Sequence, residues 1–267
     1  MIDRCIIYFI ILSFIGYVYE SIAMTFWGGK WDNRGFLFGP IIPIYGFGAL
    51  GGTLFFRYAM VEYTPLQVFL IAVFASAVLE YSVHYAMEQL FHAYWWDYSK
   101  APLNLNGRIC LPASIGFGLA GLVIVYVINP WLVPWIERLP GALTEVLAIL
   151  LTFLFTADLT LTVTIVSGFE NRVEAMDNFI NEHMDDLVSN YLDESKGWNN
   201  KFYNAVDRLE EGRKRLIRDR VEKTVNSMSG IYHETLSRIK GYRGKNASKL
   251  NYMLKRIKQK IGRNKDE

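Results

Sequence analysis

Ionisable side chains interrupt the long apolar segments that fill residues 1–168, and this feature constrains the fold more than any other. A charge placed in hydrocarbon costs roughly 2.5–3.5 kcal/mol on insertion scales. Each such side chain therefore needs a partner or a use, and the surrounding helices must cover it. We expect these side chains to gather on one side of a membrane, beside two polar loops. The residues concerned are Glu20, Glu80, His84, Glu88 and Asp158.

Five segments are long and apolar enough to cross a bilayer, which takes about 20 residues. The second starts among prolines and glycines, which predicts a broken or re-entrant element that protein or water must cover. The expected fold class is all-α: a polytopic membrane helix bundle of about five transmembrane helices, with a charged helical cytoplasmic domain at the C-terminus. The segments are 5–27, 37–60, 66–91, 112–136 and 141–168.

The charge distribution divides the chain near Gly168. Residues 1–168 carry 7 Lys and Arg against 10 Asp and Glu, whereas residues 169–267 carry 21 against 16. We therefore expect a transmembrane helical domain over 1–168 and a cytoplasmic tail over 169–267. Apolar residues recur in the tail at helical spacing, which predicts amphipathic, coiled-coil-like helices that need each other, a partner chain or the bilayer.

Basic residues favour one orientation in the membrane, because positively charged loops stay on the cytoplasmic side. With the N-terminus outside, the inner loops carry Lys30, Arg34, Lys100 and Arg108, and the basic tail lies in the cytoplasm. We therefore predict a multi-pass protein of the plasma (inner) membrane, with the N-terminus outside and the C-terminus inside.

The last stretch of the tail is predicted to be a short basic amphipathic helix. Leu250, Met253 and Ile257 mark its apolar face, and lysines and arginines fill the rest. Such a helix suits an anionic cytoplasmic leaflet. We expect anionic lipid, and not nucleic acid, to be its partner. The residues expected at the membrane surface are Lys255, Arg256, Lys258 and Lys260.

Glycines are frequent in the second and fourth apolar segments. Small residues let helix backbones approach closely in lipid. Tight packing within the chain is the favoured interpretation, and a dimer interface is the alternative. The glycines are Gly48, Gly51, Gly52, Gly116, Gly118 and Gly121.

A polar stripe lies in the second half of the third segment, where Glu80, His84 and Glu88 recur four residues apart. Neighbours at this spacing share one helix face and can touch. A carboxylate beside an imidazole can pass a proton near neutral pH, and two carboxylates with an imidazole can also hold a divalent metal. A buried polar seam paired with Arg34, Arg108 or backbone groups is the third interpretation. We expect no metal centre and no cofactor.

The two polar loops supply further candidates. Arg34 and Arg108 can clamp an anionic head group or the intramembrane carboxylates, and Asp97 can pair with either arginine instead. Asparagines in turns cap helix ends, and Asp158 can bind a ligand or form a salt bridge. The candidate ligand-binding or proton-relay residues are Glu20, Arg34, Glu80, His84, Glu88, Asp97, Tyr98, Asn106, Arg108 and Asp158.

Five motifs in fixed order carry a resemblance to a known family. They are the runs 16–20, 33–40, 43–46, 96–99 and 104–109, with the sequences GYVYE, NRGFLFGP, PIYG, WDYS and NLNGRI. Over roughly residues 5–165 the chain resembles the family described as putative ABC-transporter type IV (CmpB-like). The resemblance implies a bacterial multi-pass inner-membrane protein, and the family name implies a permease subunit.

Three functions fit these features. The first is a permease-like transport subunit without its own ATPase, because the sequence has no GxxxxGK[ST] loop; a separate cytoplasmic ATPase would then dock on residues 169–267. The second is a membrane scaffold or sensor with a partner-binding tail. The third is a membrane-embedded enzyme acting on a lipid substrate, using carboxylates, a histidine and arginines for acid–base chemistry.

Overall fold

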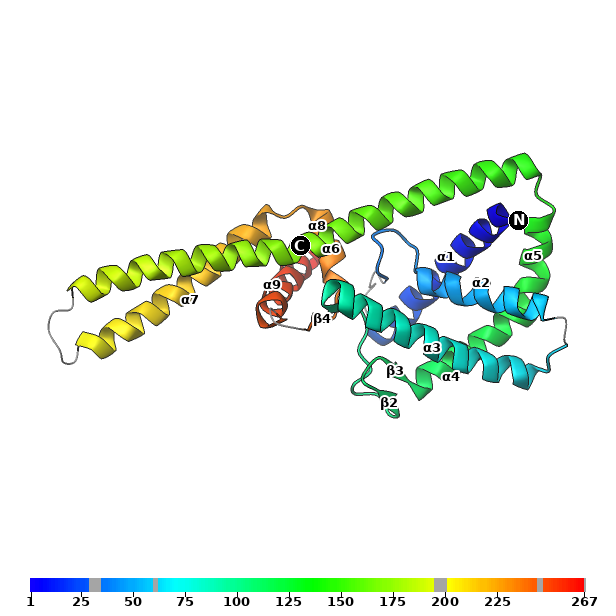
Figure 1. The fold of residues 1–267 in the computed structure, drawn as a ribbon, viewed down its shortest axis with the longest axis horizontal. Coiled ribbons are helices and arrows are strands. Elements are labelled where there is room, and N and C mark those ends of the chain that lie inside the picture. Colours follow the sequence, from blue (N-terminus) through cyan, green and yellow to red (C-terminus); the bar gives the residue numbers. More distant parts are fainter. Residues whose placement is uncertain (29–34, 60–61, 195–200, 244–246, 267) are drawn as a thin grey trace. The chain divides into compact units, whose positions relative to one another are not determined.

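The computed structural model describes residues 1–28, 35–59, 62–194, 201–243 and 247–266, and within them it is almost entirely helical (Figure 1). The chain forms two compact units. The membrane unit comprises Met1–Val163 together with Arg238–Gly244, and the tail unit comprises Thr164–Ser237 together with Lys245–Glu267. A short piece of the tail thus belongs to the membrane unit.

Within the described ranges the secondary structure consists of helices and four strands of two residues each. The helices are α1 (Ile2–Gly28), α2 (Pro43–Tyr58), α3 (Pro65–Phe91), α4 (Leu111–Val123), the π-helix η1 (Ile124–Ile128), α5 (Asn129–Glu137), α6 (Gly141–Glu194), α7 (Lys201–Ser227), α8 (Gly230–Ser237) and α9 (Ala247–Asp266). The strands are β1 (Ala93–Tyr94), β2 (Asn104–Leu105), β3 (Ile109–Cys110) and β4 (Gly241–Tyr242).

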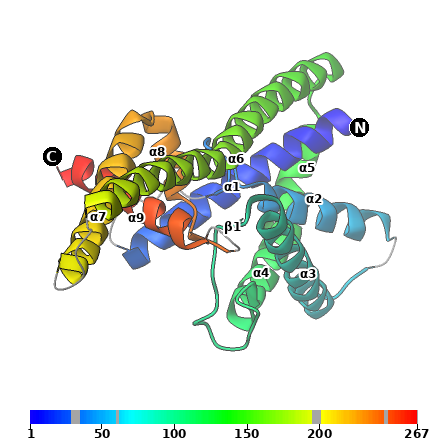
Figure 2. The ribbon, with the colours of Figure 1, turned by 60° about the vertical axis from the view of Figure 1, so that its left-hand side comes forward.

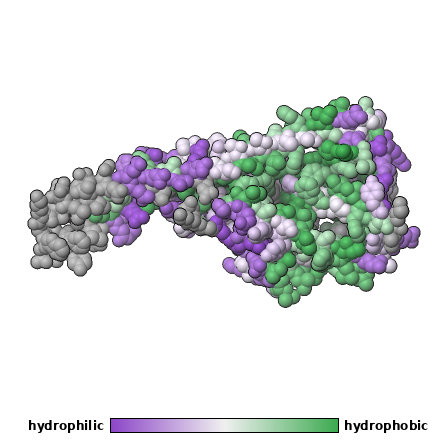
Figure 3. Space-filling model, viewed as in Figure 1, coloured by the Kyte–Doolittle hydropathy of each residue, from purple (hydrophilic) through white to green (hydrophobic). Residues whose placement is uncertain are grey.

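Four helical stretches of the described chain are long and apolar enough to cross a membrane. They are Ile2–Ala23, Pro65–Phe91, Leu111–Glu137 and Gly141–Met184. The predicted helical fold is thereby confirmed, and four of the five expected spans correspond to candidate membrane spans by length and composition. Figure 3 shows hydrophobic residues over much of the visible surface of the membrane unit. Exposed side chains such as Phe74, Leu90 and Ile149 suit contact with lipid.

The second apolar segment differs from the expected span over 37–60. Its helix, α2, has only 16 residues and starts at Pro43, which occupies the first helical turn. Proline fixes φ and has no N–H to donate, so it starts a helix well but cannot continue one. Residues 35–42 consequently form an irregular segment before α2, in line with the predicted broken element.

Helix α3 carries the polar stripe, and its ends are well defined. At its start Thr64 and Gln67 form a capping box, in which the Thr64 N–H donates to Gln67 Oε1 at 2.9 Å. At its end His92 adopts a left-handed conformation with φ of 49°. The capping box fixes the start of the helix and the left-handed residue fixes its end, so the stripe ends where the 92–110 loop begins.

Close helix pairs build the membrane unit, and glycines bring them together. Helix α3 packs along α4, and α1 packs along α2 (Figures 1 and 2). A Cβ atom at Gly118 would lie 2.5 Å from Val73 Cγ2, and one at Gly121 would lie 2.6 Å from Ala72 Cβ. These two glycines therefore pack within the chain, as the favoured interpretation held. A Cβ at Gly116 would meet no atom within 4 Å.

A core cluster forms at the end of the bundle where the chain begins, which we call the N-terminal end. It contains buried residues of α1, α2 and α5. A polar network lies beside it: Tyr8 donates a hydrogen bond to Asn129 Oδ1 at 2.7 Å, and Asn129 Nδ2 donates to Thr53 Oγ1 at 2.9 Å. The network ties three helices together without an unsatisfied amide. The core residues are Ile7, Tyr8, Leu12, Ala49 and Ile136.

Helix α6 continues through Gly168 as one helix of 54 residues, where a domain boundary was expected. A single glycine weakens a helix by only about 1 kcal/mol, so it need not end one. In the tail unit the second half of α6 folds back against α7, since the Arg220 guanidinium lies 4.0 Å from the Phe179 ring centroid. The position of the domain boundary stays a prediction.

Helix α9 corresponds to the predicted basic amphipathic helix. Its apolar face is covered in the structure: Leu250, Met253, Leu254 and Ile257 are buried, and α9 packs against α7 and α8. The apolar face thus contributes to the core of the tail unit. Contact of the basic residues with a membrane surface stays a prediction.

Candidate functional site

Three segments of the membrane unit meet at the end opposite the N-terminal end, which we call the loop end. They are the last turns of α3, the 92–110 loop and residues 240–243. Strand β4 pairs antiparallel with β1, so that Ala93 lies opposite Tyr242. Backbone hydrogen bonds extend this pairing, because Lys240 N donates to Tyr94 O at 2.8 Å and Arg243 N donates to His92 O at 2.7 Å. The pairing fixes part of the tail against the end of α3.

Glu88 is the electrostatic centre of this arrangement. Its carboxylate accepts hydrogen bonds from Arg108 Nη2 at 3.0 Å and from Arg243 Nη1 at 3.1 and 3.3 Å. The Glu88 side chain is 13% exposed, and those of Arg108 and Arg243 are 14% and 39% exposed. One arginine comes from the loop and the other from the tail, so Glu88 joins two remote parts of the chain.

Arg108 is held on several sides. Its Nη1 donates to the Tyr81 hydroxyl at 2.8 Å, and its guanidinium lies 5.0 Å from the ring centroids of both Tyr81 and Tyr85. Asn106 donates to the same Tyr81 hydroxyl at 3.2 Å. Arginine is well suited to a site that demands ion pairing and aromatic contact together. The geometry pairs Arg108 with an intramembrane carboxylate, one of the two roles considered for it.

His84, the middle residue of the polar stripe, is almost completely buried against the loop, at 2% exposure. Its Nε2 lies 3.2 Å from Trp96 O, and its Nδ1 lies 3.7 Å from Glu88 Oε2. The imidazole also meets the Trp96 ring edge-on, at 5.2 Å between centroids. An imidazole placed between a carbonyl and a carboxylate can hold a proton toward either one.

Glu80 occupies a separate part of the stripe, one turn before His84. It is 4% exposed, and its Oε1 accepts a hydrogen bond from the Tyr98 hydroxyl at 2.9 Å. Among the described residues, its other oxygen, Oε2, has no hydrogen-bond partner. Burial and the Glu80 carboxylate raise the pKa of Tyr98 well above its usual range. Tyr98 therefore remains a hydrogen-bond donor to Glu80 at physiological pH.

Glu20 is the second carboxylate in this region. Its Oε2 accepts a hydrogen bond from the Tyr45 hydroxyl at 3.3 Å. Its charge adds to the rise in the pKa of Tyr98, whose hydroxyl donates to Glu80. Glu20 of α1, Glu80 of α3 and the two tyrosine hydroxyls are thus neighbours in the membrane unit. Such a group can hold a proton or a cation between its oxygens.

Polar side chains of the 92–110 loop form hydrogen bonds with the loop's own backbone. Asp97 Oδ1 accepts the Ser99 N–H at 2.9 Å, and this bond lowers the pKa of the Asp97 carboxyl. Asn104 accepts the Gly107 N–H at 3.1 Å and donates to Ala101 O at 2.8 Å. Asp97 and Asn104 therefore shape the turn that presents Tyr98 and Arg108, and Asp97 forms no ion pair within the described part of the chain.

Asp158 has a different partner from those considered at the sequence level. Its two carboxylate oxygens accept the backbone N–H groups of Phe38 at 3.0 Å and Gly39 at 2.9 Å. From the tail, Arg238 donates to the carbonyls of Leu37 and Phe38. The irregular segment before α2 is therefore bound by two side chains: the Asp158 carboxylate accepts from its N–H groups, and the Arg238 guanidinium donates to its carbonyls. We call these two side chains the clamp on residues 35–42.

The structure thus brings most of the expected residues to the loop end, in three groups. Glu20 and Glu80 form one with Tyr98; His84, Glu88, Arg108 and Asn106 form another; Asp158 forms the third. Arg34 lies outside the described residues, as does the side chain of Lys260. Lys255 is exposed, and Arg256 and Lys258 are half-buried on α9.

Two important residues, Arg238 and Arg243, were not found from the sequence. They are two of many basic residues in the tail, and no spacing separates them from the others. Tyr45 was quoted in a motif but not assigned a role. No group of three or more possible metal ligands occurs among the residues that the structure describes.

The fold and the buried carboxylates on its apolar helices define a multi-pass helical membrane protein. The family described as Putative ABC-transporter type IV matches residues 7–163, which is more than half of the chain, and the chain belongs to this family. This confirms the resemblance seen in the motifs. No curated protein and no solved structure matches the chain.

Proposed function

We propose that the chain is a permease-like membrane subunit of a transporter, which takes its energy from a separate cytoplasmic ATPase. Family membership supports this proposal. The single structural observation that carries it is Glu80: a carboxylate 4% exposed on a candidate span, with one oxygen that has no partner among the described residues. Ionisable groups held in spans at such a cost mark ion and substrate pathways.

In this proposal Glu80 and Glu20 bind the polar or cationic part of the cargo, or a proton that moves with it. Tyr98 and Tyr45 each donate to one of the carboxylates and hold its orientation. The Glu80 Oε2 atom is then the free acceptor that a bound cation or protonated group satisfies. A buried polar atom without a partner costs about 1–3 kcal/mol, which a ligand of this kind would recover.

The proposed orientation places the N-terminus outside and the tail in the cytoplasm of a bacterial cell, with the inner membrane as its location. The loop end then faces the cytoplasm. An ATPase would dock on the tail, over residues 169–267, and the basic residues of α9 would contact anionic lipid head groups. Arg243, in the stretch of the tail that belongs to the membrane unit, forms an ion pair with Glu88 and so connects the proposed docking region to the polar stripe.

The test is purification of the tagged full chain from native membranes, with mass spectrometry of the proteins that co-purify. We expect a stoichiometric cytoplasmic ATPase. Its ATP hydrolysis should be stimulated by the small-molecule fraction of the cell in wild type and not in Glu80→Gln. Glu145→Gln, which changes an exposed glutamate on α6, is the matched control and should retain stimulation. Absence of any ATPase from a folded, intact preparation would reject the permease role.

A membrane scaffold or sensor is the second candidate, and one observation favours it. Strand β4 and Arg243 fasten the tail to Glu88 and β1, so a partner bound to the tail would act directly on the membrane unit. The same purification separates the two functions. A stoichiometric partner without an ATP-binding motif, retained equally by Glu80→Gln, would assign the scaffold or sensor function.

A further inference from the structure

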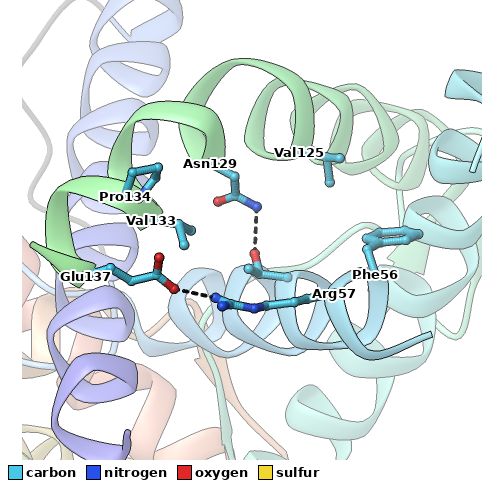
Figure 4. A pocket seen from close by; sticks show the side chains of 8 residues that line it. Phe56, Arg57, Val125, Asn129, Val133, Pro134 and Glu137 are labelled. Carbon is cyan, nitrogen blue, oxygen red and sulfur yellow. Dashed lines mark hydrogen bonds and ion pairs between the residues drawn. The ribbon is translucent and has the colours of Figure 1, made fainter. Parts of the chain in front are cut away.

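A cavity of about 310 Å³ lies at the N-terminal end of the bundle, whereas the polar stripe lies at the loop end. The cavity opens between the end of α2 on one side and η1 and α5 on the other (Figure 4). Thr53, Phe56 and Arg57 line it from α2. The opposite wall contains Val125, Asn129, Val133, Pro134 and Glu137.

The backbone of the opposite wall is irregular. Residues Ile124–Ile128 form a π-helix, in which the Asn129 N–H donates to Ile124 O. Pro130 follows directly and has no N–H to offer. Single π-turns inserted in α-helices occur frequently at functional sites. Here the π-turn lies where the wall of the cavity begins.

An ion pair joins the two walls of the cavity. Arg57 Nη1 lies 2.8 Å from Glu137 Oε1, and the two side chains are 56% and 43% exposed (Figure 4). An ion pair this accessible contributes little to stability. Its two ends are therefore free to exchange their mutual contact for an anion at Arg57 and a cation at Glu137.

The polar side chains Thr53 and Asn129 that line the cavity already have hydrogen-bond partners. Asn129 Nδ2 donates to Thr53 Oγ1 at 2.9 Å, and the Tyr8 hydroxyl donates to Asn129 Oδ1 at 2.7 Å. The remaining lining is apolar: Phe56, Val125, Val133 and Pro134. The cavity thus combines one cation, one anion and an apolar wall, an arrangement that fits an amphipathic zwitterion.

The surroundings place this cavity at a membrane–water interface. It lies at the ends of α2 and α5, and Trp131 and Trp135 of α5 are 81% and 54% exposed. Exposed tryptophans at the ends of spans lie at the level of lipid head groups. A second hollow borders the other side of α5, lined by both tryptophans together with Ile15 and Val127.

We propose that this cavity binds the head group of a zwitterionic phospholipid that carries a primary ammonium, with its phosphate at Arg57 and its ammonium at Glu137. The Arg57 guanidinium donates two parallel hydrogen bonds to the phosphate oxygens, and the Glu137 carboxylate accepts hydrogen bonds from the ammonium N–H groups. Phe56 and Val125 contact the start of the acyl chains. An anionic lipid with a glycerol head group satisfies Arg57 but leaves Glu137 facing a neutral group, so the site prefers the amine.

The test uses the full chain in nanodiscs made from equal amounts of phosphatidylethanolamine and phosphatidylglycerol. Native mass spectrometry counts the lipids that remain bound after release. We expect phosphatidylethanolamine to be enriched at least fivefold over phosphatidylglycerol in wild type. Glu137→Gln and Arg57→Gln should each reduce the enrichment to less than twofold. Enrichment in wild type that persists in Glu137→Gln would overturn the proposal, as would equal retention of the two lipids by wild type.

Two further variants separate binding from folding. Val125→Phe puts a ring into the cavity and leaves both charges, and it should also abolish the enrichment. Glu210→Gln is the matched control, because it removes an exposed pair of similar length, Lys214 Nζ to Glu210 Oε1 at 2.6 Å, away from the cavity. It should bind lipid as wild type does. Loss of enrichment in the Glu210 variant would show that the readout reports general damage and would reject the assignment.

Discussion

The contact between α1 and α2 depends on Gly46, and replacing this glycine by alanine tests the packing directly. Gly46 is buried. An added Cβ would overlap the Ser13 hydroxyl and would lie 2.6 Å from Phe9 O and 2.7 Å from Phe9 Cδ2. A ring or a hydroxyl can rotate away, but the Phe9 carbonyl belongs to the backbone of α1. The two helices must therefore separate to admit the methyl group.

The expected magnitude follows from two opposing effects. Overpacking of a filled interface costs about 1–3 kcal/mol, and the upper part of that range applies here because backbone is in the way. Alanine recovers up to about 1 kcal/mol of helix propensity relative to glycine. The net loss for Gly46→Ala is therefore about 1–2 kcal/mol. In a protein of this size that corresponds to a fall in Tm of about 2–8 °C.

Gly52→Ala is the matched control, because a Cβ at Gly52 in the same helix would meet nothing within 4 Å. It should gain propensity without overlap, so its Tm should stay level or rise by about 2–4 °C. Tryptophan fluorescence during heating in one detergent at one scan rate measures both variants. Equal shifts for Gly46→Ala and Gly52→Ala would show that α1 and α2 do not pack as described.

Three further outcomes are expected from the loop end. Arg108→Gln should lower the free energy of unfolding by about 2–3 kcal/mol, as for a nearly buried charge-assisted hydrogen bond. Arg243→Gln should lower it by only about 0.5–1 kcal/mol, because the Arg243 side chain is 39% exposed. Thermal unfolding of both variants gives the order of the two losses, and the reverse order would contradict the assigned geometry. Because the pKa of Tyr98 is raised in the folded state, its contribution is complete below pH of about 10 and is lost as the pH rises further, since the unfolded chain releases the proton first. Tyr98→Phe should therefore show a shallower alkaline loss of Tm than wild type, and an identical slope would exclude this role. Asp158→Ala leaves the Gly39 N–H without its acceptor and the Phe38 N–H with Thr162 Oγ1 at 3.2 Å, which should cost about 1–3 kcal/mol and increase protease cleavage within residues 35–42. Unchanged cleavage would count against the role of Asp158 in holding this segment.

Local patterns were sufficient to predict the helical membrane fold and the residues of the polar stripe. Hydropathy and length located the four candidate spans, although they also predicted a fifth over 37–60, and the four-residue spacing placed His84 next to Glu88. The loop motif around Trp96 and Asn104 predicted a turn, and Asn104 Oδ1 does accept the Gly107 N–H within that turn, although it caps no helix end. Each of these inferences uses residues that are close in the sequence, where helix periodicity and turn chemistry act.

Long-range pairings could not be predicted in the same way. Arg243 meets Glu88 across 155 residues of chain, and Arg238 meets Leu37 across 201. An arginine in the tail looks the same in the sequence whether its side chain faces water or a backbone carbonyl, so neither composition nor periodicity identifies its partner. The role of Asp158 was missed for a similar reason: its partners are backbone N–H groups of an irregular segment, which any sequence can supply.

The clamp on residues 35–42 also determines when this protein can finish folding. Arg238 reaches Phe38 across 200 residues of chain. At a synthesis rate of about 5–20 residues per second, roughly 10–40 s pass between the emergence of these two residues. During that interval the carbonyls of Leu37 and Phe38 have no guanidinium donor. The apolar helices that precede Arg238 in the chain have by then been synthesised. Completion of the loop end is therefore a late step of biogenesis, and a nascent chain stopped before residue 238 would leave the membrane unit open at that end.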